Sequence, residues 1–166
     1  RAALQLLKPV LPAAAGAVSS MAGQALLQSF GVPTAAAKLA TNADEAVAAA
    51  KALGYPVVLK IESTDILHKT EANGVVLNLG DDTAVRSAVA TLIANAKQYK
   101  ADARMTGVLV QAMARGDVEL VIGLKRDPTF GPVVMVGLGG VLIEVFKDGV
   151  FRAAPVTDAE FLGKKK

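Results

Sequence analysis

The second half of this sequence is a series of strand-like segments whose connections are too short for a crossover. The segments are GVLVQAM from Gly107, VELVIGLK from Val118, PVVMVGLGG, and VLIEVFKDGVFRAA. Parallel neighbours need a crossover of about a dozen residues or more, so these strands must pair antiparallel. Within the last segment, Asp148-Gly149 is typical of a tight hairpin turn.

The first half combines helical and strand-like patterns. Ser20 is expected to cap a first helix that ends at Gly31. The side chains expected on its inner face are Leu26, Leu27 and Phe30. Residues 34–39 are expected to form a short extended piece.

The clearest helix signal lies in TNADEAVAAAKALGYP. Asn42 or Thr41 can cap this helix, and Glu45 stands at capping-box distance from Asn42. Gly54 and Pro56 end it. The positions on its apolar face are Ala43, Val47, Ala50 and Leu53.

Two strands and a longer helix complete the first half. The pattern of Val57 to Ile61 predicts a buried strand. The polar segment ESTDILHKTEAN is expected to be an irregular loop, and GVVLNL is expected to be a strand that ends at Leu79. Asp81 or Asp82 then caps a helix. Its inner positions are Val85, Val89, Leu92 and Ala96. We predict an α+β fold, in which a mixed N-terminal αβ subdomain precedes an antiparallel sheet. A doubly wound fold is disfavoured, since neither GxGxxG nor GxxxxGK[ST] occurs.

Composition narrows the functional classes. No apolar run approaches the roughly 18 to 20 residues of a membrane span, so no membrane association is expected. The chain has no cysteine, which argues against a disulfide framework and favours a cytoplasmic location. The net charge of +3 includes Lys164, Lys165 and Lys166, so nucleic acid is not an expected partner.

We expect three regions along the chain. Residues 1–18 contain Pro9 and Pro12 and are interpreted as a linker, residues 19–160 as the domain, and residues 161–166 as a tail. The sequence begins with Arg1, so we expect it to be an excerpt of something longer.

Two residues of the first half are candidates for chemistry. Lys60 interrupts an apolar strand, where its ammonium either reaches past the sheet edge to solvent or meets an anion. His68 is the single histidine and lies in a polar loop with Lys69 and Thr70. It is either a solvated side chain or part of a loop that approaches a phosphate.

The second half offers further candidates. A strand ends at Gln111, Ala112 and Met113. This segment is either a strand that runs into a turn or a hinge whose backbone hydrogen-bonds an adenine edge. Glu119 is either solvated or near ribose hydroxyls. Arg126 precedes a turn where a guanidinium suits a phosphate.

Glycines and one acid follow. Gly139 and Gly140, with Gly137, form either a tight reversal or a backbone cradle for an anion. Glu144 interrupts an apolar strand and needs a partner. A three-residue turn at 147–149 places Arg152 opposite Glu144, whereas a two-residue turn places them on opposite faces.

The order of these segments resembles the ATP-grasp domain of NDP-forming acyl-CoA synthetases, which include ADP-forming acetyl-CoA synthetase. The resemblance covers about Met21 to Glu160, and HKT and RDPTFGPVVM are its most specific stretches. In chain order the segments are GYPVVLK, DILHKTEANGV, GVLVQAM, ELVIGLKRDPTFGPVVMVGLGG and EVFKDGVFRAAPVTDAE.

The resemblance implies an acid-thiol ligase that interconverts a carboxylate, CoA and ATP with an acyl-CoA, ADP and phosphate, through an acyl phosphate and a phosphohistidine. It implies that Lys60 holds the nucleotide phosphates, that 111–113 form the adenine hinge and that Glu119 lies near the ribose. His68 would receive the phosphoryl group. Gly139, Gly140, Arg126 and Glu144 would surround the nucleotide and its phosphates.

The sequence departs from the family pattern at two points. Asn73 replaces the first of two glycines after the histidine loop, and asparagine tolerates the same left-handed backbone. The EINPL-like and DAR-like motifs that carry the magnesium ligands do not occur. We therefore predict no metal ligand in this chain, inactivity of this stretch alone, and CoA-binding and ligase domains or subunits as partners.

Two other readings stay open. One is a non-catalytic, nucleotide-sensing ATP-grasp-like domain of a protein acetyltransferase. The other is a carboxylate-amine ligase of the wider ATP-grasp group. His68 favours the synthetase over both, because a sensor does not use a phosphoryl acceptor.

Overall fold

The computed structural model describes residues 17–114, 116–140 and 149–157. The chain divides into two compact units, with the boundary between Ala114 and Arg115. The predicted order of elements is confirmed for the described residues, and every strand pair in both units is antiparallel.

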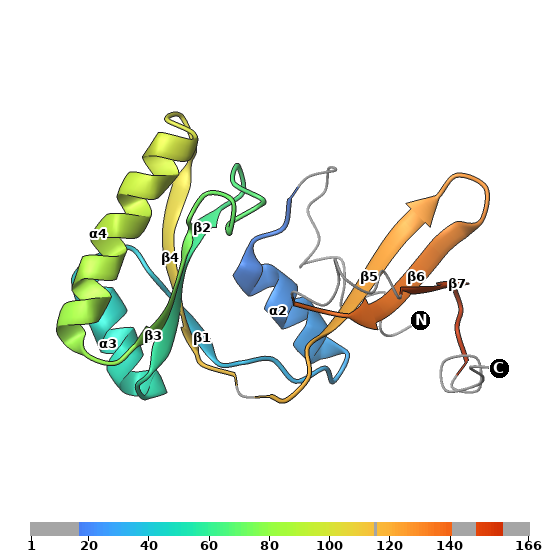
Figure 1. The fold of residues 1–166 in the computed structure, drawn as a ribbon, viewed down its shortest axis with the longest axis horizontal. Coiled ribbons are helices and arrows are strands. Elements are labelled where there is room, and N and C mark those ends of the chain that lie inside the picture. The colour runs from blue at the N-terminus through green and yellow to red at the C-terminus, as the bar shows by residue number, and fades with distance from the viewer. Residues whose placement is uncertain (1–16, 115, 141–148, 158–166) are drawn as a thin grey trace. The chain divides into compact units, whose positions relative to one another are not determined.

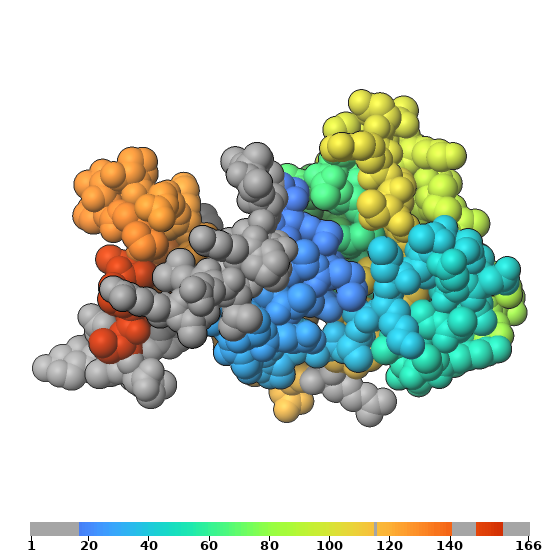
Figure 2. Space-filling view, turned by 180° about the vertical axis from the view of Figure 1, so that it is seen from behind, coloured from blue at the N-terminus to red at the C-terminus, as the bar shows by residue number. Residues whose placement is uncertain are grey.

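The first unit contains a four-stranded sheet in the order β1-β4-β2-β3. Its elements are α2 (Ser20–Ser29), β1 (Ala37–Ala40), α3 (Ala43–Leu53), β2 (Val57–Ser63), β3 (Val75–Leu79), α4 (Asp82–Tyr99) and β4 (Met105–Ala112). Helices α3 and α4 cover one face of the sheet, and α2 lies on its other side (Figure 1). Seen from behind, the edge strand β1 reaches the surface between α2 and α3 (Figure 2).

Local hydrogen bonds start the two long helices as the sequence predicts. Oδ1 of Asn42 accepts from the N–H of Glu45 at 2.9 Å, and Oε2 of Glu45 accepts from the N–H of Thr41 at 2.7 Å. For α4, Oδ1 of Asp81 accepts from the N–H of Ala84 at 2.8 Å. These side chains satisfy amides that have no partner within the helix.

The prediction for α2 is wrong in two respects. Ser19 caps the helix in place of Ser20, because Oγ of Ser19 accepts from the N–H of Ala22. The helix has no buried residue, and Phe30 is 54% exposed. The physical reason is that α3 and α4 already cover the apolar face of the sheet, so α2 meets the more polar face.

The core of the first unit lies between the sheet and helices α3 and α4. Alternate residues of β2 and β4 point into it, and the sheet residues concerned are Val57, Leu59, Ile61, Val108 and Val110. The inner positions predicted for α3 and α4 pack against them. The predicted end of β2 at Ile61 is wrong, since the strand continues to Ser63. Glu62 and Ser63 are buried there by tertiary contacts, despite their polarity.

The second unit contains a three-stranded sheet in the order β5-β6-β7. Its strands are β5 (Leu120–Asp127), β6 (Gly131–Leu138) and β7 (Val150–Ala153). The segment expected to precede β7 in a hairpin, with Glu144, lies outside the described residues. Arg152 of β7 pairs with Val134 of β6.

One face of this second sheet presents aliphatic side chains to solvent within the described part of the chain. Leu120, Ile122 and Leu124 alternate along β5, and Ile122 is 70% exposed. No described helix combines the length and the apolar character that a membrane crossing needs.

Candidate functional site

Lys60 lies on the face of the first sheet that points away from α3 and α4. Its strand neighbours Leu59 and Ile61 point into the core, so strand alternation turns Lys60 the other way. Nζ of Lys60 donates a hydrogen bond to Oε1 of Gln111 at 2.8 Å. Burial lowers the pKa of Lys60 below its usual value, and the charge of Lys69 lowers it further. The ammonium of Lys60 is therefore half-buried, with the neutral side chain of Gln111 as its hydrogen-bond acceptor.

The predicted hinge segment, residues 111–113, begins at Gln111, the hydrogen-bond partner of Lys60. Gln111 is paired with Val58 in the register of β4 and β2, which places its side chain next to Lys60. The N–H of Ala112 donates to the carbonyl of Ala36 at 2.9 Å, so this amide belongs to the sheet. Met113 follows the last residue of β4 and is partly exposed.

His68 lies in the loop between β2 and β3, and its side chain is 73% exposed. Its Nδ1 is 3.8 Å from Oε1 of Glu71. The loop itself is packed down on both sides of His68, because Ile66 and Ala72 are buried in the core. The imidazole is thus presented to solvent from a loop that Ile66 and Ala72 anchor in the core.

Asp65, near the start of the histidine loop, and Lys69, in its middle, each make a charged contact. Asp65 accepts hydrogen bonds from the backbone N–H, Nε and Nη2 of Arg104, which hold the pKa of this carboxyl well below its usual range. On the other side, Nζ of Lys69 donates to Oε2 of Glu62 at 3.0 Å. The cation next to His68 is therefore paired and points to the sheet.

Glu62 is the residue that the sequence analysis missed. It is 3% exposed and lies two positions after Lys60 on the same face of β2. Burial opposes its charge, but hydrogen bonds from Ser20 and Lys69 outweigh that effect and lower the pKa of Glu62. The spacing of Lys60 and Glu62, two positions apart, places both side chains on one face if they belong to one strand. The predicted strand ends at Ile61, so Glu62 was not recognised as part of that face.

In the second unit, three predicted residues lie together. The N–H of Gly139 donates to the carbonyl of Glu119 at 2.8 Å. A Cβ at Gly140 would lie 2.6 Å from Oε2 of Glu119, so glycine allows this close approach. Arg126 is paired with Pro132 at the opposite end of β5, so the structure does not bring it to Glu119. Glu144 lies outside the described residues.

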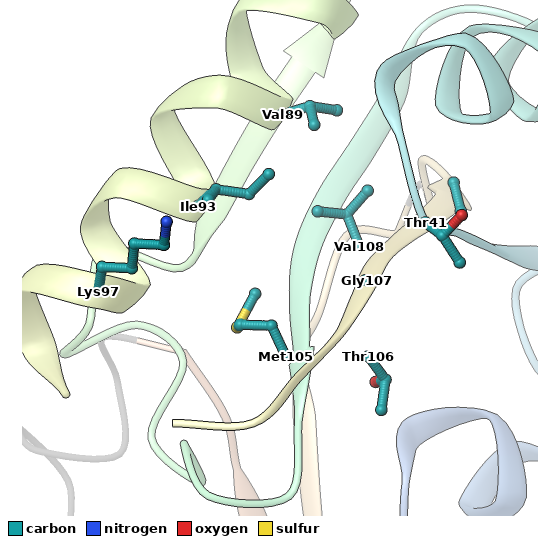
Figure 3. A pocket seen from close by; sticks show the side chains of 9 residues that line it. Thr41, Val89, Ile93, Lys97, Met105, Thr106, Gly107 and Val108 are labelled. Carbon is teal, nitrogen blue, oxygen red and sulfur yellow. The ribbon is translucent and has the colours of Figure 1, made fainter. Parts of the chain in front are cut away.

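The first unit also has an apolar cavity of about 240 Å³ between α4 and the strands β1 and β4 (Figure 3). Val89, Ile93 and Lys97 of α4 line it from one side. Residues of β4 line the other side, namely Met105, Thr106, Gly107 and Val108. None of the predicted site residues lines this cavity, so it is separate from the Lys60 face.

A family model described as an ATP-grasp domain matches residues 10–162. The chain belongs to the ATP-grasp domain family. This ATP-grasp chain is 50% identical over 138 residues to a 4-hydroxybutyrate–CoA ligase (ADP-forming) of Nitrosopumilus maritimus, covering 83% of this chain and 20% of that protein. It is 44% identical over 137 residues to the beta subunit of acetate–CoA ligase (ADP-forming) I of Pyrococcus furiosus, covering 82% of this chain and 59% of that subunit.

Solved structures agree with the ATP-grasp fold. The acetyl-coenzyme A synthetase 1 of Ca. Korarchaeum cryptofilum, in complex with coenzyme A and Ca-AMPCP, matches with a TM-score of 0.85 and 40% identity. The match covers 94% of this chain and 68% of that one. The same synthetase with Mg-AMPPCP has its phosphohistidine segment pointing towards the nucleotide binding site, and matches with a TM-score of 0.66 and 36% identity over 95% of this chain and 64% of that one.

Among the described residues, no group of three or more histidine, aspartate or glutamate side chains could hold a metal ion. Magnesium prefers carboxylates together with substrate phosphates, and the buried carboxylate of Glu62 is already paired with Lys69.

Proposed function

We propose that this ATP-grasp chain is the nucleotide-binding module of an NDP-forming acyl-CoA synthetase. The reaction of the whole enzyme interconverts a carboxylate, CoA and ATP with an acyl-CoA, ADP and phosphate, through an acyl phosphate and a phosphohistidine. Support comes from relatives named as ADP-forming CoA ligases, which match most of this chain.

The contact between Lys60 and Gln111 carries the proposal. These residues are 51 positions apart, yet their side chains meet at 2.8 Å at the start of the 111–113 segment. Lys60, the proposed cation for the phosphates, and Gln111, at the start of the proposed adenine hinge, thus lie on the same side of one sheet. The ammonium of Lys60 donates a hydrogen bond to Gln111. A phosphate bound next to Lys60 would compete with Gln111 for this ammonium.

His68 is the proposed phosphoryl acceptor. A neutral imidazole nitrogen attacks the terminal phosphorus, the bond from that phosphorus to the bridging oxygen breaks, and ADP leaves with the bond electrons. The exposed side chain of His68 supports this role, because a phosphoryl group must reach it from a bound nucleotide. Lys60 offsets the charge that arrives with the phosphoryl group.

The remaining assignments complete the module. Glu119, with Gly139 and Gly140 beside it, takes the ribose side, and Arg126 and Glu144 act around the phosphates. Magnesium supplies charge neutralisation when bound, through ligands outside this chain. CoA-binding and ligase domains or subunits are the proposed partners, in the cytoplasm.

The test uses the complete enzyme that carries this chain. It is incubated with magnesium and ATP radiolabelled at the terminal phosphate, and acid-labile, base-stable label is counted. We expect the label to require His68, so His68→Ala abolishes it. Undiminished label in His68→Ala would remove this residue from the mechanism, and nucleotide binding without any such label would indicate a nucleotide sensor.

Lys60→Met is tested in the same enzyme by calorimetric titration with ATP. A hydrogen bond to a charged group contributes about 1.5 to 3 kcal/mol, so we expect the dissociation constant to rise about tenfold to a hundredfold. Lys51→Met is the control, because Lys51 pairs with Asp82 at the surface, apart from the Lys60 face.

A further inference from the structure

The lysine next to His68 is held inside a closed polar cluster, which we call the Glu62 cluster and which consists of Ser20, Glu62 and Lys69. Nζ of Lys69 donates to Oγ of Ser20 at 2.7 Å and to Oε2 of Glu62 at 3.0 Å. The N–H of Ser20 donates to Oε1 of Glu62 at 2.7 Å. Each member contacts the other two.

Burial makes this cluster act as a unit. The side chain of Glu62 is 4% exposed and that of Lys69 is 20% exposed. A buried charge is costly when unpaired, so removal of either partner leaves the other in an unfavourable place. Alternative positions of Lys69 that leave Glu62 without a cation are therefore disfavoured.

The backbone of Lys69 is fixed as well. Its carbonyl accepts from the N–H of Gly74 at 2.7 Å, and the carbonyl of Gly74 accepts from the N–H of Ile61 at 2.8 Å. Lys69 is thus tied to β2 by its side chain and, through Gly74, by its main chain. His68 is the residue immediately before Lys69, so its Cα has little freedom to move.

We propose that Glu62 and Lys69 are positioning residues, which hold the His68 loop on β2 so that the imidazole meets the terminal phosphate of the nucleotide. This inference rests on the proposed function of His68. Of these two lysines, the pairing leaves Lys60 to face the phosphates, since the charge of Lys69 is balanced by Glu62.

The predicted signature is a separation of phosphoryl transfer from nucleotide binding. In the complete enzyme, Glu62→Gln and Lys69→Met are expected to slow the labelling of His68 about tenfold to a hundredfold, as a displacement of about 1 Å can do. The dissociation constant for ATP is expected to change less than the labelling rate, because Lys60 and Gln111 are intact. Lys69→Arg restores the pairing and is expected to recover most of the rate.

A second measurement and a control variant make the test decisive. Hydrogen exchange at the amides of Ala72 and Gly74 in the nucleotide-free enzyme is expected to be faster in Glu62→Gln and Lys69→Met. Lys51→Met breaks a lysine–carboxylate pair of 2.7 Å elsewhere and is expected to change neither exchange nor labelling.

Wild-type labelling rates in both variants would overturn the proposal. An equal loss of ATP affinity and labelling would also overturn it, since the cluster would then support nucleotide binding and not the position of His68. Failure of the proposed function is recognised separately, because His68→Ala would then keep its label whatever the amide exchange shows.

Discussion

Replacement of Gly74 by alanine tests whether the His68 loop is held against the core. A Cβ at this position would lie 2.5 Å from Cδ1 of Ile61 and 2.8 Å from the carbonyl oxygen of Lys69. Ile61 is fully buried, and the carbonyl of Lys69 accepts from the N–H of Gly74 itself. Neither neighbour can yield without loss.

The structure can accommodate the added methyl group in two ways, and both lower the free energy of unfolding by similar amounts. If the loop stays in place, overpacking costs about 1 to 3 kcal/mol. If the loop lifts from β2, the hydrogen bonds from Gly74 N–H to Lys69 and from Ile61 N–H to Gly74 are lost, at about 1 kcal/mol each. We therefore expect Gly74→Ala to lower the free energy of unfolding by about 1 to 3 kcal/mol.

Urea denaturation followed by tyrosine fluorescence measures this loss in the first unit. The chain has no tryptophan, and its two tyrosines, Tyr55 and Tyr99, both belong to that unit. Gly80→Ala is the matched control, since a Cβ there meets no atom within 4 Å. Its stability is expected to stay within about 0.5 kcal/mol of the wild type, or to rise. Equal midpoints for Gly74→Ala and Gly80→Ala would refute the reasoning.

Two further outcomes can be measured with the same signal. Asn42→Ala removes the acceptor of the Glu45 N–H and is expected to cost about 1 kcal/mol, and an unchanged midpoint would contradict the capping role. The pKa of Glu62 is lowered from 4.5 by folding, so its contribution to stability is fully present above pH 4.5 and is lost as the pH falls through the lowered pKa. The stability difference between the wild type and Glu62→Gln should therefore shrink below pH 4.5, and a difference that stays constant to lower pH would show that this carboxylate is not the titrating group.

Features that depend on neighbouring residues were predicted well from the sequence. Asn42 and Asp81 cap their helices through amides three positions away, which is a local interaction. Asn73 adopts a φ of 46°, in the left-handed region expected from its place in the family pattern. The antiparallel pairing of β5 and β6 follows from a connection too short for any other arrangement.

Features that depend on distant residues could not be predicted in this way. The end of β2 was placed too early because Glu62 is polar, yet its charge is satisfied by Lys69 and by Ser20, 42 positions away. The inward face assigned to α2 was wrong because the sheet face available to that helix carries polar groups. The spacing of apolar residues within one helix does not show which face of the sheet the other helices leave uncovered.

The sequence by itself determined the caps, the turns, the period of each element and the family, because these arise from backbone interactions over a few residues and from motif order. The tertiary structure decided which side chains meet. The sheet order β1-β4-β2-β3 places β4 beside β2, and this non-sequential neighbour brings Gln111 to Lys60. Long-range pairing of this kind is fixed by burial of the whole sheet against α3 and α4, which no single segment encodes.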